Sequence, residues 1–134
     1  PAITLYQDLA VVASASRSQT FPADTTGIVV GANAQGAGDT NIQEFTYGYL
    51  EDMRVYSRAL SATELACIRN SDGRDYIYDG LLFRLAMDEH PEGSVASGAG
   101  SIKDSGPLGM HGTPNGACVY GPSRFGLKRT PSVL

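Results

Sequence analysis

Hydrophobic and polar residues alternate most clearly between residues 44 and 57, which is the pattern of a β-strand with one buried face. Phe45, Tyr47 and Tyr49 fall on one face of this stretch, and polar residues such as Arg54 fall on the other. Aromatic and β-branched residues also favour strands over helices. We therefore predict a strand over residues 44–57.

Shorter runs of the same kind predict further strands. Residues 3–15 are expected to be extended, with a hairpin turn at Gln7-Asp8. Asp79-Gly80 is a turn signal between two strand-like runs. The remaining predicted strands are 27–31, 76–78, 81–87 and 117–120, and residues 32–40 are expected to form a loop.

One short helix is predicted, over residues 62–69. Ser61 is a typical N-cap residue, and Glu64 follows three positions later, which is the arrangement of a capping box. A helix of this length is marginal by itself in water. We therefore expect Leu65 and Ile68 to dock it on the sheet.

No other part of the chain has a helical period, and its 16 glycines suit tight turns between strands. The chain of 134 residues has the length of one ordinary domain. These features predict an all-β protein, an antiparallel β-sandwich with one short helix, in a single domain over residues 1–134.

Charge and hydropathy narrow the classes of partner. The chain carries 10 Lys and Arg against 14 Asp and Glu, a formal net charge of −4, so nucleic acid is not expected as a partner. No apolar run approaches the length of a membrane span, so no membrane partner is expected. The start, Pro1 to Thr4, lacks the features of a signal peptide and resembles a chain from which an initiator Met was removed. A chain trimmed from a larger precursor, or a fragment of one, would begin in the same way. Of these interpretations we favour a full-length chain made in the cytoplasm.

The cysteines and histidines do not have the spacing of a metal site. Cys67 and Cys118 are far apart in sequence, and so sparse a pair favours two buried free thiols over a disulfide. His90 and His111 lie in loops rich in Gly and Pro, without a partner at a ligand-like spacing. The chain also lacks a nucleophile-elbow serine and a phosphate-binding loop. We expect no enzymatic activity and no catalytic residues.

Two stretches resemble a known family. Residues 48–65 closely resemble the end of a laminin-G-like, concanavalin-A-like jelly-roll domain. The stretch contains a glycine, two acids, an Arg between aliphatic residues, a Tyr, and a segment that opens a short helix. In order these are Gly48, Glu51-Asp52, Arg54, Tyr56 and Arg58-Ala59-Leu60-Ser61.

Residues 80–89 are similar to the beginning of the same kind of domain. There a first strand ends in an acid pair, here Asp88-Glu89, and an Asp-Ser-Gly turn precedes a Gly-Thr strand, here residues 104–106 and 112–113. Residues 1–70 thus resemble the family's C-terminal half, and residues 80–134 resemble its N-terminal start. The order is swapped, and the Trp-containing middle of the family's domain is missing.

The swapped order leaves three explanations open: a circular permutant, the junction of two tandem domains, or a reduced sandwich completed by a neighbouring copy. In the family, the first and last strands lie side by side and antiparallel. The resemblance therefore implies that the two stretches share one sheet. Open sheet edges are an aggregation hazard unless they are paired. This consideration favours a subunit that associates with itself or with a scaffold.

The acidic residues raise the question of calcium. Asp88, Asp104 and Asp52 are the candidate ligands, provided that the fold gathers them, because Ca²⁺ needs several oxygen atoms from different loops. For Asp104, an Asx turn over residues 104–106 is the favoured interpretation. For Asp52 beside Arg54, a buried ion-pair network and a solvated strand face are both open.

Tyrosines dominate the candidate interface residues. A Tyr ring offers a rigid apolar face with a polar tip, which suits both sugar stacking and protein contacts. Tyr76, Tyr78 and Tyr49 are the candidates, and Arg129 in the basic tail is a candidate for an acidic partner.

These observations and the resemblance together lead to an expected function. We expect a non-enzymatic structural or adhesive subunit on a virion surface, a capsid decoration or cement protein that binds neighbouring subunits or a larger protein shell. The alternative is a carbohydrate-binding, lectin-like module of an extracellular protein, with glycans as partners. This step is an analogy, because a fold does not determine a function.

Overall fold

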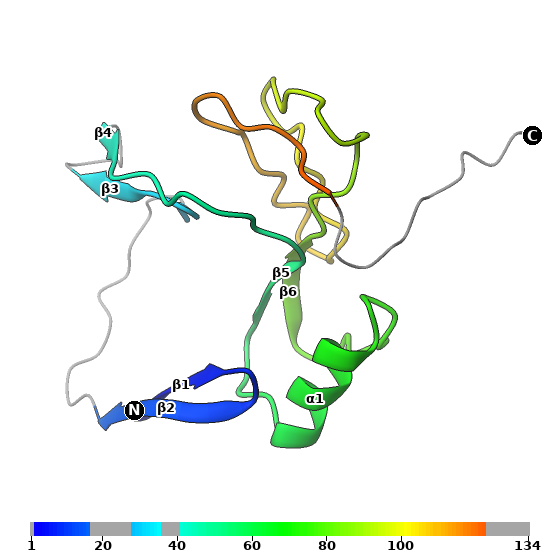
Figure 1. The fold of residues 1–134 in the computed structure, drawn as a ribbon. Helices are drawn as coiled ribbons and strands as arrows, with labels where there is room; N and C mark the ends of the chain where they lie inside the picture. Colours follow the sequence, from blue (N-terminus) through cyan, green and yellow to red (C-terminus); the bar gives the residue numbers. More distant parts are fainter. Residues whose placement is uncertain (1, 17–27, 36–40, 123–134) are drawn as a thin grey trace, which may run out of the picture. The chain divides into compact units, whose positions relative to one another are not determined.

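The computed structural model describes residues 2–16, 28–35 and 41–122 (Figure 1). The chain divides into two compact units, Pro1–Gly48 and Tyr49–Leu134, and each is described by itself. The described residues form strands and one short helix, as expected. Their sheets are all two-stranded and antiparallel, and they do not form a clear sandwich. The single domain over residues 1–134 stays a prediction.

The first unit begins with a β-hairpin. Strand β1 (Ala2–Gln7) pairs antiparallel with β2 (Ala10–Ser16), which confirms the hairpin predicted within residues 3–15. Its two turn residues, Asp8 and Leu9, both have positive φ angles, 51° and 69°. This is the twist that a two-residue hairpin requires, although glycine or asparagine is the usual choice there. Every residue of both strands is exposed.

A second, smaller hairpin lies later in this unit. Strand β3 (Asn33–Gln35) pairs antiparallel with β4 (Asn41–Gln43), so part of the predicted 32–40 loop is a strand. The buried strand predicted over residues 27–31 is wrong for residues 28–30, where no strand forms and Ile28 is exposed. Gly31 has a φ of 76°, so the backbone bends directly after this apolar run.

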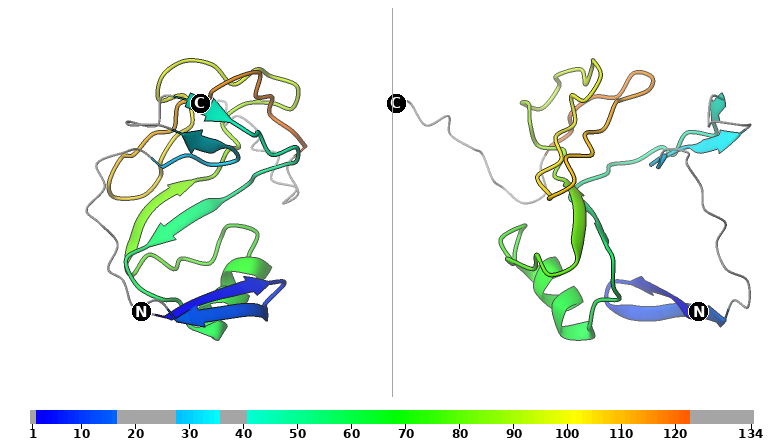
Figure 2. Two further views of the ribbon diagram at one scale, coloured as in Figure 1. Left: turned by 90° about the vertical axis from the view of Figure 1, so that its left-hand side faces the viewer. Right: turned by 180° about the vertical axis from the view of Figure 1, so that it is seen from behind.

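The second unit is organised around one strand pair. Strand β5 (Met53–Tyr56) pairs antiparallel with β6 (Leu81–Leu85), and the two lie side by side in each view of Figure 2. The two strands come from the two stretches that resemble the family, and they pair as that resemblance implies. Leu81, Phe83 and Leu85 of β6 are buried, with Ala96 and Tyr120, and form the core of the described residues.

The predicted strands over residues 44–57, 76–78 and 81–87 are longer than those observed. Asp52, Tyr76 and Met87 have φ angles of 52°, 59° and 60°. These left-handed backbone positions are incompatible with an extended strand. They end β5 on its N-terminal side, prevent a strand at 76–78, and lie just beyond the end of β6. The predicted strand over residues 117–120 is reduced to an isolated bridge between Val95 and Val119.

The single helix, α1 (Ala62–Asn70), starts where the sequence predicts. The Ser61 side chain accepts a hydrogen bond from the Glu64 backbone N–H, and the Glu64 carboxylate accepts one from the Ser61 N–H. The Arg58 guanidinium and the Ser61 groups lower the pKa of Glu64 to about 2. The two residues predicted to dock the helix, Leu65 and Ile68, are half-buried, and no helix residue is fully buried.

Replacing Ser61 with alanine removes the N-cap acceptor. We expect the Ser61→Ala variant to lose about 1 kcal/mol of unfolding free energy, because a backbone N–H at the helix start loses its partner. Urea denaturation followed by far-ultraviolet circular dichroism measures the change. The control is Thr63→Ala, an exposed position inside the first turn. An equal effect of the two variants would contradict the capping role.

Candidate functional site

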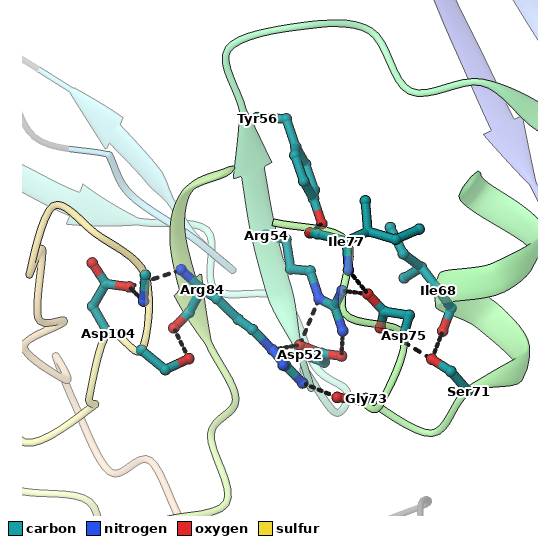
Figure 3. Close-up of polar contacts among 12 residues, drawn as sticks. Asp52, Arg54, Tyr56, Ile68, Ser71, Gly73, Asp75, Ile77, Arg84 and Asp104 are labelled. Atoms are coloured by element: carbon teal, nitrogen blue, oxygen red, sulfur yellow. Dashed lines mark hydrogen bonds and ion pairs between the residues drawn. The ribbon is translucent and has the colours of Figure 1, made fainter. Parts of the chain in front are cut away.

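Four charged side chains of the second unit form a connected group, here called the Arg54 cluster: Asp52, Arg54, Asp75 and Arg84. Arg54 of β5 lies between two carboxylates (Figure 3). Its Nε and Nη2 donate to Oδ1 and Oδ2 of Asp52 at 3.0 and 2.7 Å, and its Nη1 donates to Oδ1 of Asp75 at 2.8 Å. The planar guanidinium suits this two-sided arrangement, which a lysine would not reproduce.

The second arginine of the cluster extends it across the strand pair. Arg84 of β6 donates through Nε to Oδ1 of Asp52 at 2.6 Å and through Nη2 to the carbonyl oxygen of Gly73 at 3.1 Å. A Cβ atom at Gly73 would lie 2.7 Å from Nη2 of Arg84, and the φ of Gly73 is 79°. The left-handed backbone therefore favours glycine where this loop meets the arginine.

Asp75 connects the cluster to the segment that joins α1 to β6. Its Oδ1 accepts the backbone N–H of Ile77 at 3.0 Å, and its Oδ2 lies 3.0 Å from Oγ of Ser71. Oγ of Ser71 is also 3.2 Å from the carbonyl oxygen of Ile68, in the last turn of the helix. The Tyr56 hydroxyl donates to the carbonyl oxygen of Ile77 at 3.0 Å. These contacts brace the loop from both strand and helix (Figure 3).

The side chains of the cluster are largely shielded from solvent, and the pKa values of its two carboxylates are lowered. The side chains of Arg54 and Asp75 are 6% and 2% exposed. Burial raises the pKa of Asp75, but the hydrogen bonds from Arg54 and the Ile77 N–H outweigh it, and the pKa lies well below its usual value. The same balance, with Arg54 and Arg84 as donors, lowers the pKa of Asp52. Of the two interpretations left open for Asp52 and Arg54, the buried network is confirmed.

Asp104 is a second buried acid with a structural role. It is 8% exposed, and its carboxylate accepts three backbone N–H groups. Those of Arg84 and Gly106 bind Oδ1 at 2.8 and 2.6 Å, and that of Met110 binds Oδ2 at 2.7 Å. The contact with Gly106 confirms the predicted Asx turn. Burial raises the pKa of Asp104, but these three hydrogen bonds lower it further than burial raises it.

The candidate calcium ligands are not brought together. Within the described residues, no group of three or more His, Cys, Asp or Glu side chains could hold a metal ion. Asp52 is engaged by two arginines and Asp104 by backbone amides, so the oxygens of both already have partners. Asp88 lies shortly after the end of β6 and is half-buried. Asp88, Asp104 and Asp52 therefore do not meet the condition set for a calcium site, that the fold gathers them.

The tyrosines predicted as interface residues are exposed. Tyr76 and Tyr78 are 77% and 59% exposed, and their rings meet edge to face with centroids 6.4 Å apart. Tyr49 is also exposed, and its ring covers Gly121, where a Cβ atom would lie 2.6 Å from the ring. Tyr76 combines a large exposed ring with a left-handed φ of 59°, a strained choice for a non-glycine residue. Arg129 lies outside the described residues.

The remaining candidate residues are the two cysteines and the two histidines. Cys67 and Cys118 are free thiols, as predicted, but both are exposed, so the expectation of buried thiols is wrong. Nδ1 of His111 accepts the backbone N–H of Asp104 at 3.0 Å, and the His90 ring packs edge to face on Tyr120. In the described part of the chain, no helix has the length and apolar character needed to cross a membrane.

Sequence reasoning missed two members of the Arg54 cluster, Asp75 and Arg84. Arg84 stands inside the apolar run Leu81 to Leu85, and a charge in a half-buried strand signals a need for a partner. Asp75 carries no comparable signal, because its partner Arg54 is 21 residues away in sequence.

Comparison of the chain with protein-family models, with curated proteins and with solved structures finds no match. The resemblance of residues 48–65 and 80–89 to a laminin-G-like domain therefore rests on the residues quoted for it.

Proposed function

We propose that this chain is a non-enzymatic structural or adhesive subunit of laminin-G-like type, whose incomplete sandwich is completed by neighbouring subunits. The specific location that we propose is a virion surface. There the chain serves as a capsid decoration or cement protein on a larger shell assembled in the host cytoplasm. The setting is argued by analogy with other coats that use such domains.

The observation that carries the proposal is the imbalance between buried and exposed apolar side chains. Five apolar or aromatic residues of the described chain are buried, whereas eighteen large ones are exposed. Two-stranded sheets are marginal in water unless further strands or a packed face support them. A chain that exposes this much apolar surface is suited to bury it against a partner.

The braced tyrosine loop supports an interface role. The loop that carries Tyr76 and Tyr78 is held by Asp75 and by the Tyr56 hydroxyl, so the two rings are presented on a fixed backbone. Rigid, pre-positioned aromatic rings bind partners at a low entropic cost and are common interface hot spots.

Sedimentation velocity of the full chain, with and without its native particle, tests the proposal. We expect ordered oligomers or shell-bound subunits, and we expect the double variant Tyr76→Ser/Tyr78→Ser to weaken that association about tenfold or more. The control is Tyr47→Ser, a fully exposed tyrosine outside the braced loop. A monomer that binds no shell would overturn the proposal.

A carbohydrate-binding, lectin-like module of an extracellular protein is the second candidate, because exposed tyrosine rings such as Tyr76 and Tyr78 also stack on sugars. A glycan array probed with and without calcium separates the two functions. Glycan binding by a monomer, lost in the double tyrosine variant, would favour the lectin and reject the coat subunit.

A further inference from the structure

The hairpin β1–β2 has the features of an incomplete sheet. All six residues of β1 and all seven of β2 are exposed, and within the described residues no third strand pairs with either. An isolated two-stranded hairpin is at best marginally stable, and three or more strands with an apolar face are needed. The hairpin therefore gains stability from any further strand that pairs with it.

The outer edge of β1 is the more regular of the two free edges. The pairing register shifts between Leu5 and Tyr6, so that Val12 is an extra residue in β2. Such bulges protect an edge against pairing. Strand β1 contains no charged residue, no proline and no glycine, so it lacks the devices by which proteins usually block a free edge.

We propose that β1 pairs antiparallel with β1 of a second copy of the chain, about a two-fold axis at Leu5, to give a four-stranded sheet. This inference rests on the proposed structural function and names the edge through which the subunits associate. A second copy fits because the pairing brings two identical uncharged strands together, so no like charges oppose each other.

The side-chain pattern agrees with this symmetry. In the hairpin register, Ile3 faces Ala15 and Leu5 faces Ala13, which places all four on one face. Thr4 and its partner Ser14 lie on the other face, together with the Tyr6–Val11 pair. A two-fold axis perpendicular to the sheet keeps the faces separate, so the faces that carry Ile3 and Leu5 in the two copies join into one continuous face.

Matched lysine variants of the full chain test the edge. Leu5→Lys places like charges near the axis, and Ala13→Lys places the same charge on the same face of β2, directly across from Leu5. We expect Leu5→Lys to weaken dimerisation by about tenfold or more in sedimentation velocity, because like charges on adjacent strands repel and apolar contact is lost. Ala13→Lys should leave the dimer within about twofold of the parent.

A cysteine trap tests the geometry without relying on the lysine variants. In a Cys67→Ser/Cys118→Ser background, Leu5→Cys should oxidise to a covalent dimer, whereas Ala13→Cys should form no covalent dimer under the same conditions. Both substitutions are conservative in size and lie at exposed positions.

The outcomes separate this inference from the function on which it rests. A parent chain that assembles while both lysine variants assemble equally well, or while Ala13→Lys alone fails, overturns the β1 edge and leaves the structural function standing. Failure of Leu5→Cys to form a covalent dimer also overturns the edge. A parent chain that stays monomeric and binds no shell overturns both.

Discussion

Replacing Arg54 with methionine is expected to lower the unfolding free energy of the second unit by about 3–5 kcal/mol, because Asp75 then stays buried without its cationic partner. Methionine approximates the length of the arginine stem, so the loss reflects charge and hydrogen bonds more than volume. Chemical denaturation followed by far-ultraviolet circular dichroism measures it.

The control for this prediction is Arg58→Met. Arg58 also pairs with a carboxylate, Glu64 at 2.6 Å, but its side chain is 31% exposed, so the cost should be about 1 kcal/mol or less. Adding Asp75→Leu to Arg54→Met should recover part of the loss, because the stranded carboxylate is removed. Equal effects of Arg54→Met and Arg58→Met would contradict the buried brace.

Replacing Asp104 with alanine is expected to cost about 3 kcal/mol, since the backbone N–H groups of Arg84, Gly106 and Met110 all lose a charged acceptor. Asp104→Asn should cost less, because one carbonyl oxygen still serves the two N–H groups on Oδ1. Asp79→Asn, at a side chain that is 89% exposed, is the matched control. A smaller loss for Asp104→Asn than for Asp79→Asn would contradict the assigned role.

These acids also determine how the protein responds to low pH. The pKa values of Asp52, Asp75 and Asp104 are all lower in the folded chain than the usual 3.8. A carboxyl group with a depressed folded pKa stabilises the fold above its unfolded pKa, and this stability is lost as the pH falls toward the folded value. The unfolding free energy should therefore fall below about pH 4. Urea titrations from neutral to acidic pH measure the slope, which should flatten in Asp104→Asn.

Local signals in the sequence predict local structure well in this chain. The capping box locates the start of α1, and the Gln7-Asp8 region locates the first hairpin to within a residue. Each depends on residues within a few positions of one another, so no distant contact is needed to infer it.

The ends of the strands could not be predicted from the sequence, and the reason is physical. Asp52 and Tyr76 adopt left-handed backbone angles, which aspartate tolerates better than most residues and tyrosine does not favour. The surroundings of Asp52 include hydrogen bonds from Arg54 and from Arg84, the latter 32 residues away in sequence. Alternation of polar and apolar residues predicts a strand there, because it does not detect such tertiary constraints.

The candidate site, too, could be predicted only where its residues are close in sequence. The proximity of Asp52 and Arg54 in sequence predicted a network, but Asp75 and Arg84 joined it only through the fold. The calcium hypothesis assumed that acidic side chains were available to a cation. Asp104 and Asp52 instead bind backbone amides and arginines, and such partners compete directly with a metal for the same oxygen atoms.

The geometry of β5 and β6 has a mechanical consequence. The strands are antiparallel, and Met53 faces Leu85 at the end where the chain enters β5 and leaves β6. Tension on these two chain ends therefore separates the strands one residue pair at a time, starting from that end. The bond between Asp52 and Arg84 crosses from one strand to the other at this end. It adds to the backbone hydrogen bond from the Asp52 N–H to the Ala86 carbonyl oxygen at the same end, so both bonds oppose the opening of the strand pair under load.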